Sequence, residues 1–365
     1  MAQQDPVDWQ LAARVGARLA DRKPALTDPT LAEQLNGFVG TAEELVAMET
    51  GLRSANGPAV AKVVDRGQWV EANVASFQRL LRPMLDTLSE KLSSSSNTPL
   101  AKAPLAVSRR VAGVELGMLL GWMSTRVLGQ YDLLVADDDP SAQDVVYIVG
   151  PNLLQVEQKF GFPPEEFRLW IALHECTHRA QFTGVPWLRQ HFLSLVEQAM
   201  SIGDLTDPGQ LFATLRRAVQ DRADTRQKMQ DGGMMAVIAS PQQQDALQRI
   251  SGMMSLLEGH GDVTMDRAGA GLVPSAPRFS RVLSERRKQL NPLSRIVQRV
   301  TGMEAKLNQY AAGEKFIAAI EDAGGERIID RCWVGPDALP SMAEIRRPDL
   351  WLDRMGVART ATTAG

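Results

Sequence analysis

Residues 163–182 read PPEEFRLWIALHECTHRAQF, and the chemistry of the chain is concentrated in this stretch. Two prolines followed by two glutamates favour a helix start, because proline fits the first turn and carboxylates stabilise the positive end of the helix dipole. The sequence Thr-Gly-Val-Pro at 183–186 is typical of a helix end. The stretch therefore predicts one helix that carries the motif H-E-x-x-H.

His174 and His178 are four residues apart in this helix, so their imidazoles lie on one face. Two such imidazoles can bind one metal ion, and zinc suits imidazoles together with a carboxylate. Glu175 is placed to activate a water molecule on that metal as a general base. The alternative is a helix whose histidines only make ordinary hydrogen bonds. The apolar residues Phe167 and Trp170 continue the histidine face, which favours the metal site.

A third ligand is expected on a second predicted helix at 240–269. Glu258 and Asp262 are four residues apart in it and share a face. We predict that Glu258 binds the metal and that Asp262 orients a ligand histidine through a hydrogen bond. The alternative is a pair of acidic side chains on a helix surface, or an acid paired with Arg267, without a metal.

His260 competes with Glu258 in this prediction. Two residues correspond to about 200° around a helix, so both cannot easily bind the same ion. In one alternative His260 replaces Glu258 as the ligand. In another, Gly259 and Gly261 break the helix, and His260 faces the substrate and stabilises an oxyanion. In the third, His260 belongs to a contact between helices.

Four further residues carry reactive side chains. Tyr310 lies in a helix predicted at 302–316 and either donates a hydrogen bond to a tetrahedral intermediate or is simply packed. Cys176 and Cys332 are interpreted as small buried residues and not as nucleophiles, and two cysteines make no disulfide framework. His191 is interpreted as structural.

Outside the motif the chain is mostly helical. Apolar spacing predicts helices at 8–19, 31–48 and 70–92. Two short apolar runs, 132–136 and 145–149, predict a small sheet of paired strands directly before the motif helix. The predicted fold class is therefore α+β, mostly helical.

The most apolar long stretch, 111–128, contains Gly113, Gly117 and Gly121. Glycines at this spacing predict a buried helix that another helix approaches closely. The stretch is short for a membrane span and carries Glu115, so no membrane segment is expected.

The charge balance bears on partners and location. The 365 residues include 40 Lys and Arg against 43 Asp and Glu, a net charge of −3, so nucleic-acid binding is not expected. The N-terminus lacks the basic and apolar regions of a secretory signal, and we expect a cytoplasmic protein. The sequence does not determine the oligomeric state.

Composition also suggests how the chain is divided. Four consecutive serines and two prolines mark 92–104 as a linker or flexible loop. We expect an N-terminal helical region at 1–91 packed on a catalytic domain at 105–356. The last residues, 357–365, are predicted to be a disordered tail.

At H-E-C-T-H the sequence resembles a zincin metallopeptidase, and Glu258 with Asp262 resembles the E-x-x-x-D pair of the gluzincins. A closer similarity is to a bacterial family of zincin-like hydrolases, some of which are labelled as associated with the biosynthesis of a deazaflavin coenzyme. The similarity is carried by VDWQLAARVG at 7–16, YIVGPNL at 147–153, LHECTHRAQFTGVPWL at 173–188, LLEGHGDVTMD at 256–266 and KLNQYAAGEKF at 306–316.

This resemblance implies a zincin-like fold in which a small sheet precedes the H-E-x-x-H helix. It implies one Zn²⁺ per chain, with His174, His178 and Glu258 as ligands and Glu175 as the base. In zincins the edge strand of the sheet holds an extended peptide, and the strand at 145–149 is the candidate here.

Two functions of different class follow as hypotheses. The first is a zinc-dependent hydrolase, a metallopeptidase or amidase, that acts on a peptide or a small amide. The second is a non-catalytic binding or assembly protein with a zincin fold and a structural or vestigial metal site. In that case the glycine-spaced helix and the N-terminal region would contact partners. The family label alone suggests a third hypothesis, a step in coenzyme metabolism.

Overall fold

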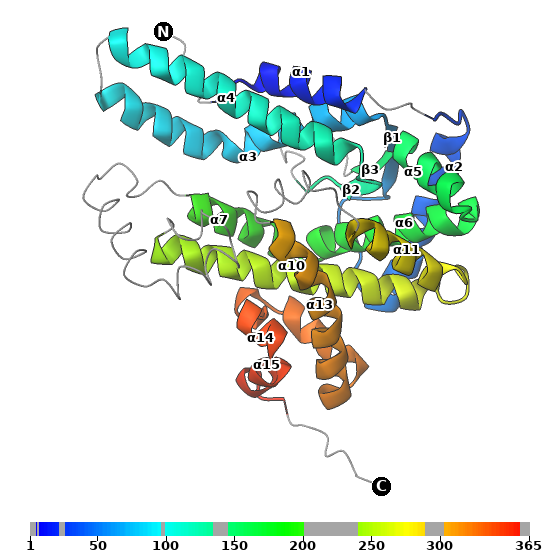
Figure 1. Cartoon of the computed structure of the whole chain (residues 1–365). Coiled ribbons are helices and arrows are strands. Elements are labelled where there is room, and N and C mark those ends of the chain that lie inside the picture. The colour runs from blue at the N-terminus through cyan, green and yellow to red at the C-terminus, as the bar shows by residue number, and fades with distance from the viewer. Residues whose placement is uncertain are drawn as a thin grey trace. The chain divides into compact units, whose positions relative to one another are not determined.

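Helices dominate the described part of the computed structural model, and three short strands within it form one sheet (Figure 1). The predicted α+β class, mostly helical, is therefore confirmed. The structure describes residues 5, 7–21, 26–95, 99–133, 145–200, 240–288 and 303–357. Backbone contacts divide the chain into two units, 1–184 with 268–280 and 185–267 with 281–365.

In the first unit, α1 (Trp9–Ala20) packs along α4 (Pro99–Ser124) (Figure 1). Three glycines of α4 face the α1 backbone: Gly113, Gly117 and Gly121. A β-carbon on any of them would lie within 3 Å of a backbone carbonyl oxygen of α1 or of the residue that caps its N-terminus. The predicted close approach of a second helix is confirmed. Because α1 covers this glycine face, the face is not available to a partner protein as the second hypothesis supposed.

Gly117→Ala is expected to destabilise the protein by about 1–3 kcal/mol. Its β-carbon would lie 2.5 Å from the Ala12 carbonyl oxygen, so one of the two helices must shift. The control is Gly37→Ala in α2 (Leu31–Thr50), where a β-carbon meets nothing within 4 Å. That change should stabilise the helix by about 0.5–1 kcal/mol. Urea unfolding measures both values, and equal free energies for the two variants would contradict this packing.

Helices occupy most of the predicted linker. α3 (Arg66–Ser95) ends inside 92–104 and α4 begins inside it, while residues 96–98 lie outside the described ranges. The two units also divide the chain differently from the predicted domains, whose boundaries stay a prediction. The predicted tail lies outside the described residues from 358 onward.

The sheet has the strand order β1-β3-β2. β1 (Val60–Val64) runs parallel to β3 (Val145–Val149), with Val60 opposite Val145. β2 (Gly129–Tyr131) runs antiparallel to β3 on its other side. β3 is thus the central strand, which agrees with its continuous apolar sequence VVYIV.

Two predictions about the sheet need correction. The first strand is predicted at 132–136, but the strand in the structure is β2, which ends at Tyr131. Residues 134–136 are outside the described ranges. The strand at 145–149 is not an edge strand, because it is paired on both sides, so the prediction that it holds a substrate peptide is wrong. Within the described residues the edge strands of this sheet are β1 and β2, and β2 packs against α6.

The described residues of the second unit form helices. α7 (Leu188–Met200), most of α10 (Pro241–Gly269) and α13 (Met303–Gly324) are its long helices. α10 begins as predicted, because Ser240 Oγ accepts from the Gln243 amide and Gln243 Oε1 accepts from the Ser240 amide. The described part of this unit also contains α11 (Ala276–Lys288), which begins in the first unit, η1 (Glu326–Trp333), η2 (Pro336–Ala338), α14 (Met342–Arg346) and α15 (Pro348–Arg354).

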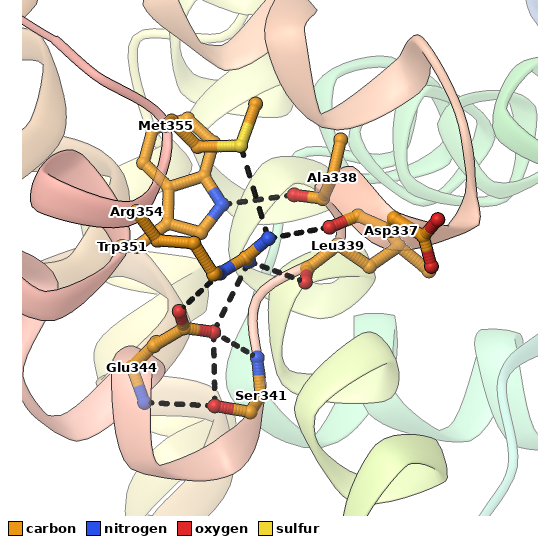
Figure 2. Close-up of polar contacts among 8 residues, drawn as sticks. All are labelled: Asp337, Ala338, Leu339, Ser341, Glu344, Trp351, Arg354 and Met355. Atoms are coloured by element: carbon orange, nitrogen blue, oxygen red, sulfur yellow. Dashed lines mark hydrogen bonds and ion pairs between the residues drawn. The ribbon is translucent and has the colours of Figure 1, made fainter.

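Arg354 ties the C-terminal elements of this unit together (Figure 2). Its Nε donates to Glu344 Oε1 at 2.6 Å and its Nη2 to the Leu339 carbonyl at 3.0 Å. Desolvation raises the pKa of Glu344, but hydrogen bonds from Arg354 and Ser341 outweigh it and leave that pKa below its usual value. Trp351 Nε1 closes the cluster through a bond to the Ala338 carbonyl at 2.8 Å.

None of the helices in the described ranges combines the length and apolarity that a membrane span requires.

Candidate metal centre

The motif helix, α6 (Pro164–Gly184), has almost the predicted bounds. Glu166, in its first turn, accepts a hydrogen bond from the Ser275 amide at 2.7 Å. α6 packs against α2 within the first unit. Buried arginines also anchor the helix: Arg168 pairs with Glu157 of α5 (Gly150–Phe160), and Arg179 pairs with Glu43 of α2. The backbone that carries the motif is therefore fixed on two sides.

His174 and His178 converge on one point, as predicted. Their Nε2 atoms are 3.2 Å apart, and the rings stand at 88° to each other. Two nitrogens that each bind zinc at about 2.0–2.1 Å in tetrahedral geometry are about 3.3 Å apart. The spacing of the two nitrogens therefore fits a shared zinc ion.

Gln181 contacts His178 on the side of the ring away from His174. Its Oε1 atom lies 3.0 Å from His178 Nδ1, and its side chain is 0% exposed. The sequence interpretation missed this residue. The available signal was its position three residues after His178 in the same helix, which places both side chains on one face.

Glu175 lies against the edge of the sheet. It is 7% exposed, and its Oε2 accepts a hydrogen bond from the Tyr131 amide of β2 at 2.9 Å. A β-carbon on Gly129 would lie 2.6 Å from Glu175 Oε1, so the carboxylate fits beside β2 only because residue 129 is glycine. Gly129 and Tyr131 are functional neighbours that spacing along the chain does not reveal.

Glu258 and Asp262 lie one turn apart on α10, and both are half-buried. Glu258 and Asp262 belong to the second unit, whereas the two histidines belong to the first. The roles of Glu258 as third ligand and of Asp262 as orienting residue stay predictions.

His260 is 5% exposed, and its ring packs edge-on against Trp333 of η1 at 5.2 Å between centroids. This agrees with the interpretation of a packing contact. α10 is continuous through this region, so the alternative in which glycines break the helix is wrong. Gly259 instead allows α13 to pack closely against α10. A β-carbon added at residue 259 would lie 2.3 Å from the Gly313 carbonyl carbon.

The two cysteines and His191 are packed side chains in the described part of the structure. Cys176 and Cys332 are free and buried, and burial raises the pKa of both thiols. Cys176 Sγ lies 3.6 Å from the Val39 carbonyl, as expected of a packed residue. His191 lies beside Trp187, and burial lowers its pKa. Tyr310 lies in α13, and its side chain is outside the described part of the structure.

Comparison with known proteins places this geometry in a family. A model of a family described as zincin-like metallopeptidases matches residues 7–352. A crystal structure of a protein from Chloroflexus aurantiacus, provisionally described as a hydrolase with a novel fold, is 33% identical, with a TM-score of 0.69. The match covers 96% of this chain and 99% of that chain. No curated protein matches the chain.

The family model covers most of the chain, and the resemblance seen at H-E-C-T-H is confirmed. Zincins hold a metal ion, typically zinc, and the paired imidazoles of α6 are suited to it. The chain belongs to the family of zincin-like metallopeptidases.

Proposed function

We propose that the protein is a zinc-dependent hydrolase that cleaves an amide bond. The convergence of His174 and His178 at 3.2 Å, next to the buried Glu175, carries this proposal. We assign Glu258 as the third ligand, since two imidazoles and one carboxylate are a donor set typical of catalytic zinc. Asp262 is assigned to orient a ligand histidine.

In this mechanism Glu175 transfers the proton between the attacking water and the leaving group. Zinc, when bound, supplies a Lewis acid that polarises a carbonyl and acidifies water. Glu175 takes a proton from the attacking water and later gives it to the leaving amine. The bond from the Tyr131 amide to Oε2 fixes the orientation of the carboxylate, so that the base needs no rearrangement before it acts.

The contact between Glu175 and β2 bears on the substrate. An extended peptide that adds to a sheet needs the backbone groups of the edge strand. Here the Tyr131 amide at that edge already donates to Glu175. This supports a small amide or a short peptide over a long chain bound as a fourth strand beside β2.

The alternative is a non-catalytic binding protein with a structural or vestigial metal site. It supposes that the glycine face of α4 binds partners, but α1 covers that face. The cytoplasmic location stays a prediction.

Metal content tests the proposal first. The full chain is purified without chelators or a His tag, next to His174→Ala, and both are measured by mass spectrometry. We expect about one zinc per chain, lost in the variant. If the wild-type protein holds no zinc after zinc is added and free ion removed, the proposal fails.

Gly129→Ala is expected to keep the zinc and to lower kcat/KM about 100-fold. The new β-carbon would push on the carboxylate of Glu175, so the base moves while the metal ligands stay. Zinc content and turnover are measured together. The control is Gly40→Ala, where a β-carbon meets nothing within 4 Å and turnover should not change. Turnover in Gly129→Ala equal to that of the control would contradict the assigned position of Glu175.

A further inference from the structure

We propose that Gln181 is a positioning residue that sets the tautomer of His178 and so prepares its Nε2 atom for the metal. The inference rests on the proposed function in one respect only, namely that His178 is a metal ligand. The contact itself lies within one helix of the first unit.

The chemistry of the two partners determines the direction of the hydrogen bond. Gln181 Oε1 is a carbonyl oxygen, which can only accept. Its partner, His178 Nδ1 at 3.0 Å, must therefore carry the hydrogen. Gln181 is 0% exposed, so water does not reach its carbonyl oxygen, while the His178 ring itself is partly exposed.

A neutral imidazole with its hydrogen on Nδ1 has its lone pair on Nε2. That is the atom that lies 3.2 Å from His174 Nε2, at the point where both rings converge. The opposite tautomer would place a hydrogen there and block binding. Gln181 thus selects the form of His178 that can act as a ligand.

This inference also bears on which histidine Asp262 can orient. His178 Nδ1 has one hydrogen to donate, and it goes to Gln181. If Asp262 orients a ligand imidazole, that imidazole belongs to His174. The group that faces His178 Nδ1 here is an uncharged amide, which can fix the ring through one hydrogen bond.

The tautomer can be read directly, because the chain contains four histidines. Metal-free protein labelled with ¹⁵N-histidine gives the Nδ1 and Nε2 shifts of each ring at a pH where the rings are neutral. The His178 signals are assigned by their absence in His178→Gln. We expect the Nδ1–H form for His178 in the wild-type protein.

Three variants separate tautomer control from general packing. Gln181→Leu removes the acceptor and is expected to populate the Nε2–H form and weaken zinc binding about 10–100-fold, measured by chelator competition. Gln181→Glu restores an acceptor and should restore the Nδ1–H form. The control is Thr177→Val. It removes a buried hydroxyl of the same helix, which donates to the Leu173 carbonyl within that helix. It should leave tautomer and affinity unchanged.

An Nε2–H tautomer in the wild-type protein overturns the inference. So does a zinc affinity in Gln181→Leu equal to that of the wild-type protein. A failure of the proposed function looks different: zinc binds, Gln181 controls tautomer and affinity, and no amide is hydrolysed. A wild-type protein that binds no zinc overturns both proposals.

Discussion

Glu175→Gln is expected to retain the zinc ion and to lower kcat/KM by about 10²–10⁴. The amide has nearly the same shape as the carboxylate, and its oxygen can still accept the hydrogen bond from the Tyr131 amide. It cannot take a proton from water at neutral pH. Metal binding and local structure therefore persist while the proton transfer is lost. Zinc analysis and turnover of an amide found by library screening measure the two effects separately.

The control for this variant is Glu165→Gln, which changes an exposed glutamate in the first turn of the same helix. It removes the same charge and should leave turnover close to that of the wild-type protein. A fully active Glu175→Gln variant would exclude Glu175 as the base. Loss of zinc in that variant would instead mean that the carboxylate holds the metal site together.

The histidine half of the site could be predicted because its spacing is local. The distance of four residues between His174 and His178 becomes one face of a helix in any fold that keeps α6 intact. The same reasoning predicted α10 almost to the residue, because Ser240 and Gln243 form a local cap. Caps and helical periodicity require only neighbours along the chain.

The sheet could not be predicted in the same way. β1 pairs with β3, a strand far along the chain. The sequence of β1, VAKVV, does not indicate which strand it pairs with. The support of Glu175 also comes from outside its helix, through Gly129 and Tyr131 of β2. These contacts depend on strand order, which periodicity does not encode. The structure therefore adds the residues that surround Glu175, whereas the sequence already indicated Glu175 itself as the candidate base.

Burial of charge was equally hidden from the sequence. Arg168 and Glu157 look like ordinary surface residues in their helices, yet they are 6% and 7% exposed. Arg168 Nε and Nη2 each donate to a different oxygen of Glu157 at 2.9 Å. The hydrogen bonds to Glu157 raise the pKa of Arg168, so the arginine stays charged inside the fold.

Glu157→Leu is therefore expected to destabilise the protein by about 3–5 kcal/mol, because it leaves a buried guanidinium without its main partner. Asp28, 3.7 Å from Arg168 Nη2, compensates only part of this loss. Urea unfolding gives the free energy. Asp349→Asn, in a pair whose side chains are 66% and 43% exposed, should change it little.

The double variant Arg168→Met with Glu157→Leu tests the cause of that loss. It removes both charges and leaves none uncompensated, so it should be more stable than Glu157→Leu alone. The difference defines a coupling energy between the two residues. If the double variant loses the sum of both single losses, the two side chains act independently and the ion pair does not anchor α6. If it recovers most of the stability, the pair fixes the helix that carries His174, Glu175 and His178.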